Sequence, residues 1–532
     1  MKKFPFIIFL ALISCFILSC QHQQTTAEPE ATESLEPITY PGVPQVIVVS
    51  GTNYEMGVQY GRQAARSIHH NLALFKTTLL QIFGKEKVTN DMNVWAYYIE
   101  KHNPALKDWL EGISAGCREA KRNISYIDLV LLTAFWSENW ARPNAPYPEE
   151  VHACSSFAAT GTATKDGKSL VAISTMLSMN GIQNLILIAV PTEGFSFIAI
   201  PIAGTVTFNA AMNSAGFAWA TTAIYSPEPI WGLASEGFFH YLAQYCKSPD
   251  EARQYLASTP RAGVTGNYIM SDAAGNISVL ESNAQNISIR EPGDLGEKSF
   301  LVNTNHFAGS YMQSYNHPRV AEFDSSYRYA TMWEYASAAA ENSEIDFGFV
   351  KGMFSYDDWY DPASKEWHYN DPGSPNGLNN YSGSRSVAQT VLFPASLIAY
   401  FQLGTPSGIG LPAYATGEYV RIKLAEDPQT IISTAGWIAL SNYDAARNLF
   451  QKQLNRDAPY LTYFVAQSIE EKLDEAFSAY EKGQDREVFA YLEESSSEKL
   501  RLMGEAMTHY TKAQLYAKMA RTDLERFRAQ AQ

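Results

Sequence analysis

The amino-acid sequence predicts an α+β fold, and three observations support this class. Short β runs separated by Gly and Asn turns fill the chain from Ala153 to about Glu281. Helical patterns, with apolar residues at every third or fourth position, lie before and after this β-rich part. Few helices interrupt the strands. This favours large antiparallel sheets, because in a parallel sheet strands and helices alternate along the chain.

Composition excludes several classes of protein. The chain has 532 residues, of which 46% are hydrophobic and 18% charged, a globular composition rather than a disordered or fibrous one. The chain has 40 Lys and Arg but 55 Asp and Glu, and it contains no prominent run of basic residues. We therefore expect no nucleic-acid partner. Neither HExxH nor CxxC spacing occurs, and no Gly-rich phosphate loop follows a strand. We therefore expect no metal and no cofactor.

Residues 1–20 have the features of an export signal: two lysines, an apolar run too short to span a bilayer, and small residues before a cysteine. The ending at residues 17–20, Ile-Leu-Ser-Cys, resembles a bacterial lipobox, which implies that Cys20 is lipidated and becomes the mature first residue. Cys15 also fits the pattern, but it would leave three large apolar residues at the mature end. A cleaved signal without lipid is the alternative.

Residues 21–42 are rich in Thr, Glu and Pro and predict a flexible tether between this anchor and the folded body. The residue after the lipidated cysteine is Gln21, whereas an Asp at this position would resemble a retention signal. The absence of that signal favours attachment to the outer membrane. We therefore expect an exported bacterial lipoprotein that is anchored to a membrane. No later stretch of the sequence is long and apolar enough to span a bilayer, and no motif specifies an oligomeric state.

Three further regions follow the tether. Residues 43–153 predict a mainly helical segment that opens with a β-like run at Val46–Val49 and ends in a proline-marked connection. Residues 154–425 predict the β-rich core. Residues 426–532 predict a C-terminal helical region. Its helices, at Tyr460–Lys482 and Glu498–Arg526, carry apolar residues on one face and charges on the other, so we expect solvated charged faces.

The core is expected to contain short strands and two helices, the first of which runs over Ser235–Tyr245 and continues at Asp250–Ala257. The expected strands are Ser155–Ala159, Ser169–Ser174, Leu185–Val190, Phe195–Ile200, Phe217–Ala223, Tyr268–Ser271, Ile277–Glu281, Phe300–Val302 and Ala388–Phe393, and the second expected helix is Asp324–Ala339.

Three cysteines remain after the signal: Cys117, Cys154 and Cys246. An odd number in an exported protein leaves at least one thiol unpaired. Catalysis is one reason for a free thiol, and burial as a small hydrophobic residue is the other. Cys154 stands out because it follows the polar connection and opens a strand. Ser114, in the Gly-x-Ser-x-Gly string at 112–116, lies in a helical pattern without a preceding strand, so we do not expect a nucleophile there.

Four segments of the chain carry a resemblance to a known family. They are residues 152–168 around Cys154, residues 51–61, the turn at residues 211–218 (Ala-Met-Asn-Ser-Ala-Gly-Phe-Ala), and residues 303–307 (Asn-Thr-Asn-His-Phe). In the order in which they follow one another along the chain, they resemble the segments of the N-terminal-nucleophile (Ntn) hydrolases of the isopenicillin-N acyltransferase-like branch. The resemblance covers roughly residues 44–425.

This resemblance implies a four-layer αββα sandwich whose precursor cuts itself between Ala153 and Cys154. The new N-terminal residue then carries both thiol and amine. A free α-amino group has a pKa of about 8, so its neutral form can accept the thiol proton. The thiolate is expected to attack a linear amide and form a thioester, which passes the acyl group to water or to an amine. Phospholipase-B-like relatives share the fold, which leaves an ester or lipid acyl substrate as an alternative.

The resemblance also assigns two further catalytic residues. Asn305 matches an asparagine whose side-chain amide points at the developing oxyanion. Arg385 lies where related enzymes often carry an arginine that favours the thiolate. His306 is expected to be structural or to line the pocket, because an Ntn nucleophile needs no histidine base.

One departure from the family pattern leaves a third alternative open. Relatives commonly place an acidic residue on the strand after the Asp-Gly-Lys turn, and this residue is thought to orient the free amine. Here the strand after Lys168 offers Ser174 and Thr175, which can supply a hydrogen bond but no charge. A catalytically degenerate binding lipoprotein is therefore the non-enzymatic alternative.

Overall fold

The computed structural model describes residues 43–140, 154–176, 182–224, 231–262, 265–316, 318–369, 371, 374, 376–378, 386–403, 418–455 and 461–531. These residues belong to one compact unit that spans Pro37–Gln532. The expected signal and tether, residues 1–42, lie outside the described residues.

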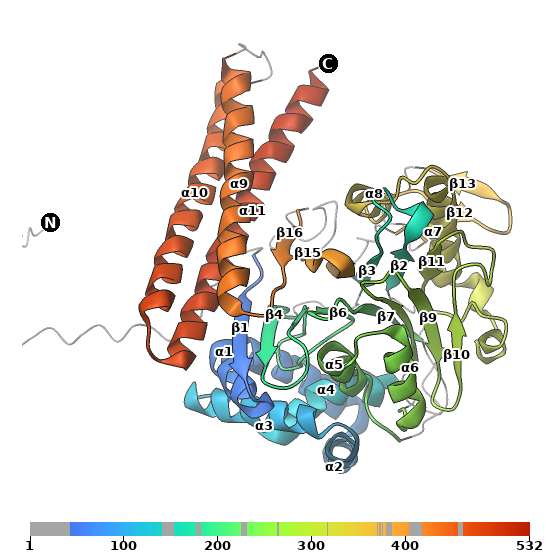
Figure 1. Ribbon diagram of the computed structural model, residues 1–532. Helices are drawn as coiled ribbons and strands as arrows, with labels where there is room; N and C mark the ends of the chain where they lie inside the picture. Colours follow the sequence, from blue (N-terminus) through green and yellow to red (C-terminus); the bar gives the residue numbers. More distant parts are fainter. Residues whose placement is uncertain are drawn as a thin grey trace, which may run out of the picture. The chain divides into compact units, whose positions relative to one another are not determined.

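The larger of two facing sheets has eight strands in the order β1-β4-β5-β6-β7-β8-β9-β10 (Figure 1). They are β1 Val46–Gly51, β4 Ile186–Pro191, β5 Phe197–Ala199, β6 Ala210–Asn213, β7 Ala218–Ile224, β8 Thr265–Ser271, β9 Ile277–Ser282 and β10 Ile287–Arg290. All neighbours are antiparallel except β1 and β4, which pair in parallel. The β-like run expected at Val46–Val49 is thus the edge strand that ties the N-terminal helices to the core.

The second sheet has six strands, all paired antiparallel, in the order β11-β2-β3-β14-β15-β16. They are β11 Phe300–Asn303, β2 Ser155–Ala159, β3 Leu170–Met176, β14 Ser386–Phe393, β15 Ile398–Leu403 and β16 Val420–Lys423. A separate hairpin joins β12 Trp359–Asp361 to β13 Glu366–His368.

Helices cover the outer face of each sheet. The helices α1 Asn53–Phe83, α2 Lys85–His102, α3 Pro104–Glu119, α4 Tyr126–Trp140, α5 Ser235–Tyr245 and α6 Pro249–Ser258 share one core with the eight-stranded sheet. The helices α7 Asp324–Glu341 and α8 Phe347–Met353 share another with the six-stranded sheet. Alternate residues of β1 show the layering, because Ile47 faces the helices while Val46 and Val48 join the core between the sheets. The α+β class and the order αββα are confirmed.

Glycines allow α1 and α3 to pack closely. A Cβ atom on Gly61 of α1 would overlap the carbonyl oxygen of Ile113, and one on Gly116 of α3 would overlap that of Val58. The Gly-x-Ser-x-Gly string therefore serves helix packing. Ser114 is buried in α3 and donates a hydrogen bond to the carbonyl of Ile124 at 2.7 Å, as expected for a structural serine.

The C-terminal helices α9 Pro428–Leu454, α10 Tyr463–Leu492 and α11 Ser496–Gln530 form a bundle with its own apolar core (Figure 1). Helix α11 also contacts the larger sheet, where the backbone N–H of Val46 donates to Oγ1 of Thr508 at 3.0 Å. None of the helices in the described part of the chain combines the length and apolar character needed to cross a bilayer.

The expectation of a solvated charged face is wrong for the middle of α11. Every residue from 502 to 515 is buried, because this stretch lies between the bundle and the sheets. Its polar side chains are paired rather than solvated. The ammonium of Lys512 binds the carboxylate of Glu475 at 2.6 Å, and the amide oxygen of Gln514 accepts from the backbone N–H of Arg421 at 3.0 Å.

Candidate active site

Cys154 lies directly before β2, as the sequence predicts, and is only 3% exposed. It belongs to the core between the two sheets. Strand β2 pairs with β3 so that Ser155 faces Ser174, which brings Cys154 beside Thr175 at the end of β3. The candidate nucleophile is therefore held on a strand end rather than on a surface loop.

Two groups donate hydrogen bonds to the Cys154 sulfur. The side-chain amide of Asn209 lies 3.4 Å from Sγ, and the backbone of Met176 supplies the second bond. Burial raises the pKa of the Cys154 thiol to about 11, although both hydrogen bonds and the charge of Arg328 act to lower it. In the uncleaved chain the thiol is thus protonated at neutral pH and needs a base before it can attack.

Arg328 connects the nucleophile to the expected oxyanion residue. Its guanidinium is fully buried, and its Nη1 atom donates to the carbonyl oxygen of Cys154 at 3.0 Å and to Oγ of Ser155 at 2.8 Å. Its Nη2 atom donates to Oδ1 of Asn305 at 3.0 Å. The carboxylate of Asp324, one turn earlier on α7, lies 3.6 Å away and supplies the counter-charge.

The side chain of Asn305 is held at both ends. Oδ1 accepts from Arg328, while Nδ2 donates to the backbone carbonyl of Ala223 on β7 at 2.7 Å. The backbone N–H of Asn305 donates to Oγ of Ser325 at 2.9 Å. An asparagine amide has two N–H protons, so one remains for a further acceptor. This fixed orientation suits an oxyanion donor.

His306 is a structural residue, as expected. Its Nδ1 atom lies 2.8 Å from Oγ of Ser325 and 3.1 Å from Oγ1 of Thr304. Burial lowers the pKa of His306 to about 4, with the charges of Arg328 and Arg290 acting in the same direction. The ring is therefore neutral at physiological pH and stabilises the turn that carries Asn305.

No carboxylate among the described residues donates to or accepts from the Cys154 side chain. At the end of β3, Oγ1 of Thr175 lies 3.4 Å from the Asn209 amide, and Oγ of Ser174 accepts from Gln389 at 3.2 Å. Within the described residues, no three His, Cys, Asp or Glu side chains gather closely enough to hold a metal ion.

Several expected residues lie outside the described part of the chain: Ala153, Arg385, Cys20 and Cys15. The buried cation beside the cysteine that the structure describes is Arg328, which sequence reasoning missed. A signal was present, since Asp324 and Arg328 are spaced as an i,i+4 ion pair at the start of an expected helix. Asn209 was also missed, because no motif includes it.

The other two cysteines are buried and free. Burial raises the pKa of both Cys117 and Cys246 to about 12. These thiols pack as small apolar residues.

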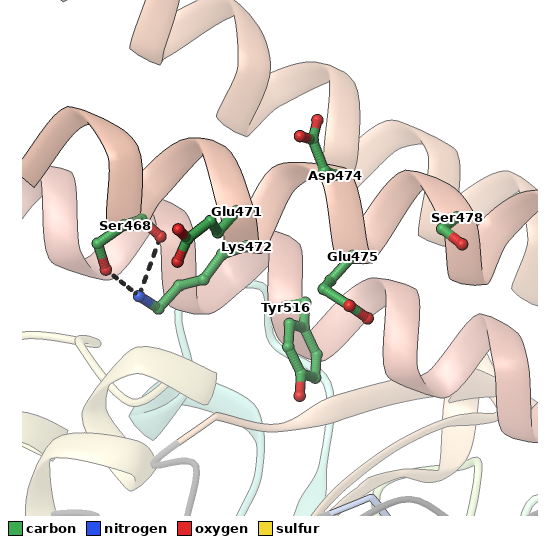
Figure 2. A pocket seen from close by; sticks show the side chains of 7 residues that line it. All are labelled: Ser468, Glu471, Lys472, Asp474, Glu475, Ser478 and Tyr516. Atoms are coloured by element: carbon green, nitrogen blue, oxygen red, sulfur yellow. Dashed lines mark hydrogen bonds between the residues drawn. The ribbon is translucent and has the colours of Figure 1, made fainter. Parts of the chain in front are cut away.

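A surface pocket of about 600 Å³ lies on the helical bundle rather than near Cys154. Figure 2 shows the side chains that line it, which come from α10 and from Tyr516 of α11. Lys472 is tied to Ser468 of the same helix, with its ammonium 2.8 Å from Oγ. The lining side chains are those of an open, polar helix surface.

The comparisons agree with the resemblance that the motifs suggest. Residues 178–355 match the family described as acyl-coenzyme A:6-aminopenicillanic acid acyl-transferase. No protein of curated function matches the chain by sequence.

Solved structures include similar chains. A mutant of conjugated bile acid hydrolase from Clostridium perfringens is 12% identical, with 52% of this chain and 93% of that chain covered and a TM-score of 0.35. Penicillin V acylase from Agrobacterium tumefaciens is 16% identical, with 47% and 83% covered and a TM-score of 0.32.

The matched segment includes the turn at residues 211–218, Asn305 and Arg328, whereas Cys154 precedes it. Over about a third of its length, the chain is therefore similar in sequence to this acyl-transferase family, in agreement with the resemblance that its motifs suggest.

Proposed function

We propose that this chain is a self-processing cysteine Ntn enzyme that cleaves or transfers the acyl group of a linear amide through a thioester on Cys154. The observation that carries the proposal is the guanidinium of Arg328, which binds the carbonyl of Cys154 and the amide oxygen of Asn305, each at 3.0 Å. One buried cation thus holds the nucleophile and the oxyanion donor in a fixed relation. The family match supports acyl transfer as the type of reaction.

Each step of the proposed reaction has a proton acceptor. After cleavage before Cys154, the neutral α-amine takes the thiol proton and the sulfur bonds to the substrate carbonyl carbon. The free N–H of Asn305 donates to the resulting oxyanion. Collapse breaks the carbon–nitrogen bond, and the leaving amine takes the proton from the α-ammonium. Water or an acceptor amine then attacks the thioester, gives a proton to the α-amine, and releases the sulfur as leaving group.

Intact-mass analysis of the purified full chain tests self-processing. We expect two chains that separate between Ala153 and Cys154 in the wild type and a single chain in Cys154→Ala. The matched control is Cys246→Ala, which removes another buried free thiol and is expected to process normally. A wild type that stays in one piece while fully active, or Cys154→Ala that releases product at the wild-type rate, would contradict the proposal.

The substrate class is tested with a panel. N-acyl amino acids should be hydrolysed if the substrate is an amide, whereas phospholipids should react if it is a lipid ester. An acyl-coenzyme A together with 6-aminopenicillanic acid tests transfer to an amine, since the matched family is described by that reaction. A single chain that binds members of the panel without turnover would favour the binding lipoprotein instead.

We also propose that lipidated Cys20 anchors the enzyme to the outer membrane. The support is the signal-like segment at residues 1–20 and the polar stretch that follows it. Cys20→Ser should lose metabolic labelling with palmitate and leave the outer-membrane fraction, while Cys15→Ser should keep both. Labelling that is lost only in Cys15→Ser would move the anchor to that residue.

A further inference from the structure

We propose that Asn209 is a positioning residue for Cys154, and that its side-chain amide holds the sulfur against the end of β3, where the described residues supply no carboxylate to the sulfur. This inference rests on the proposed function, and it adds a residue that no motif of the sequence marks. Three observations carry it: the backbone of Asn209, the contacts of its amide, and the charges around the sulfur.

The backbone of Asn209 is held in an uncommon conformation. Its φ angle is +48°, in the left-handed region, which Asn tolerates better than most residues other than Gly. The carbonyl of Asn209 accepts from the backbone N–H of Thr221 on β7 at 2.8 Å, which fixes the residue at the start of β6. Such strain persists where the surrounding structure enforces it, and here it points the side chain at the nucleophile.

The amide of Asn209 is buried, with 9% of the residue exposed. Nδ2 lies 3.4 Å from Sγ of Cys154 and 3.4 Å from Oγ1 of Thr175. Because the NH₂ group has two protons, it can donate to both atoms at once. Side chains from the start of β2, the end of β3 and the start of β6 therefore meet at one amide.

The charges around the sulfur explain why an amide suits this place. Among the described residues, the groups that act on the sulfur are the backbone of Met176 and the amide of Asn209, through hydrogen bonds, and the guanidinium of Arg328, through its charge; none of these three is anionic. Each favours the thiolate over the thiol. Asn209 is the one that acts through a side-chain hydrogen bond, so its removal leaves the sulfur free to change rotamer and raises the pKa of the thiol.

The test uses Asn209→Gly in the full-length protein. Glycine accepts a positive φ without strain, so this variant removes the amide and keeps the backbone. The readout is the rate at which iodoacetamide alkylates Cys154 at pH 8, followed by peptide mass. We expect a roughly tenfold slower rate, because the loss of one hydrogen bond to a thiolate shifts a pKa by about one unit. The thermal midpoint, measured alongside, shows that the variant is folded.

A matched control is Asn213→Ala at the end of β6, the strand that follows Asn209, since the amide of Asn213 donates to the carbonyls of Ala243 and Cys246 instead. It should lower the thermal midpoint and leave alkylation of Cys154 unchanged. The Raman S–H band of Cys154, isolated by subtracting the Cys154→Ala spectrum, should shift in Asn209→Gly alone.

An alkylation rate and an S–H band in Asn209→Gly that equal those of the wild type would overturn the inference. Neither readout requires turnover. If the wild type proves inactive, the proposed function fails, while the two readouts still decide whether Asn209 holds the sulfur. If the wild type is active and Asn209→Gly keeps its kcat and KM, the positioning role fails and the proposed function stands.

Discussion

The guanidinium of Arg328 and the side-chain oxygen of Asn305 are joined by a buried hydrogen bond of 3.0 Å. This bond leaves the amide nitrogen of Asn305 directed away from Arg328, where it binds the carbonyl of Ala223 and keeps one proton free. Arg328 thus determines which end of the amide can face a substrate. The relation makes Arg328 a positioning residue in the proposed mechanism, acting through Asn305 and through the backbone of Cys154.

Replacement of Arg328 by lysine should reduce kcat/KM by about 10²-fold while the protein still folds. A lysine ammonium cannot reproduce the planar, forked geometry with which Arg328 serves Cys154 and Asn305. The measurement is steady-state kinetics on the best amide of the panel, with the thermal midpoint as the check on folding. Arg253→Lys, at an exposed ion pair with Asp250, is the control and should keep full activity. If Arg328→Lys has the kcat/KM of the wild type, the buried guanidinium of Arg328 has a structural role only.

Asn305→Ala should lower kcat by about 10²- to 10³-fold with little change in KM. The amide is expected to bind the oxyanion of the transition state more strongly than the ground-state carbonyl, so its loss affects the chemical step. Asn305→Asp should be at least as damaging, because a carboxylate keeps the bond to Arg328 but offers no donor. If KM rises and kcat does not change, Asn305 contributes to substrate binding rather than to oxyanion stabilisation.

Sequence reasoning succeeded where the signal is local. Most core strands were expected within two residues of their bounds because alternating apolar residues mark them. Cys154 and Asn305 belong to short motifs, and their catalytic roles stay predictions. Four strands of the two sheets were missed, namely β6, β10, β15 and β16, and three of these, β6, β10 and β16, have only four residues each. Arg328 and Asn209 were missed because their roles depend on contacts with residues far away in the chain.

The buried middle of α11 shows a second kind of failure. Apolar residues on one face of a helix predict that this face is buried. They do not predict whether other elements will pack against the polar face. Lys512 and Gln514 are buried because α10 and β16 supply matching groups, and these groups come from elsewhere in the chain. Whether a helix is surrounded by other elements depends on the tertiary structure, and the spacing of apolar residues along that one helix does not reveal it.

Gly483→Ala should destabilise the protein by roughly 1–3 kcal/mol, although Gly→Ala within a helix usually stabilises. A Cβ atom at position 483 on α10 would lie 2.5 Å from Cε1 of Tyr510 on α11. The Tyr510 ring has little room to move, since it is buried and its hydroxyl donates to Glu487 at 2.6 Å. Urea unfolding measures the change. Gln484→Ala, at the exposed neighbouring position, is the control and should be neutral or slightly stabilising.

The protein should lose stability as the pH falls from about 6.5 towards 4, because buried histidines resist protonation. Burial lowers the pKa of both His240 and His306 to about 4. In the unfolded chain these rings have a pKa of about 6.5, so between the two values the unfolded state binds more protons and is favoured. Each histidine contributes a slope of up to about 1.4 kcal/mol per pH unit in this window.

The urea midpoint measured between pH 7.5 and 4.5 tests this slope. His240→Gln should flatten the curve, since glutamine does not titrate and can still meet the amides of Asn103 and Gln244 that now flank the ring at 3.1 and 3.0 Å. His69→Gln, at an exposed position on α1, should leave the slope as in the wild type. Because the comparison uses slopes rather than absolute midpoints, a general loss of stability in His240→Gln does not affect it. An unchanged slope in that variant would mean that His240 becomes protonated within the folded protein.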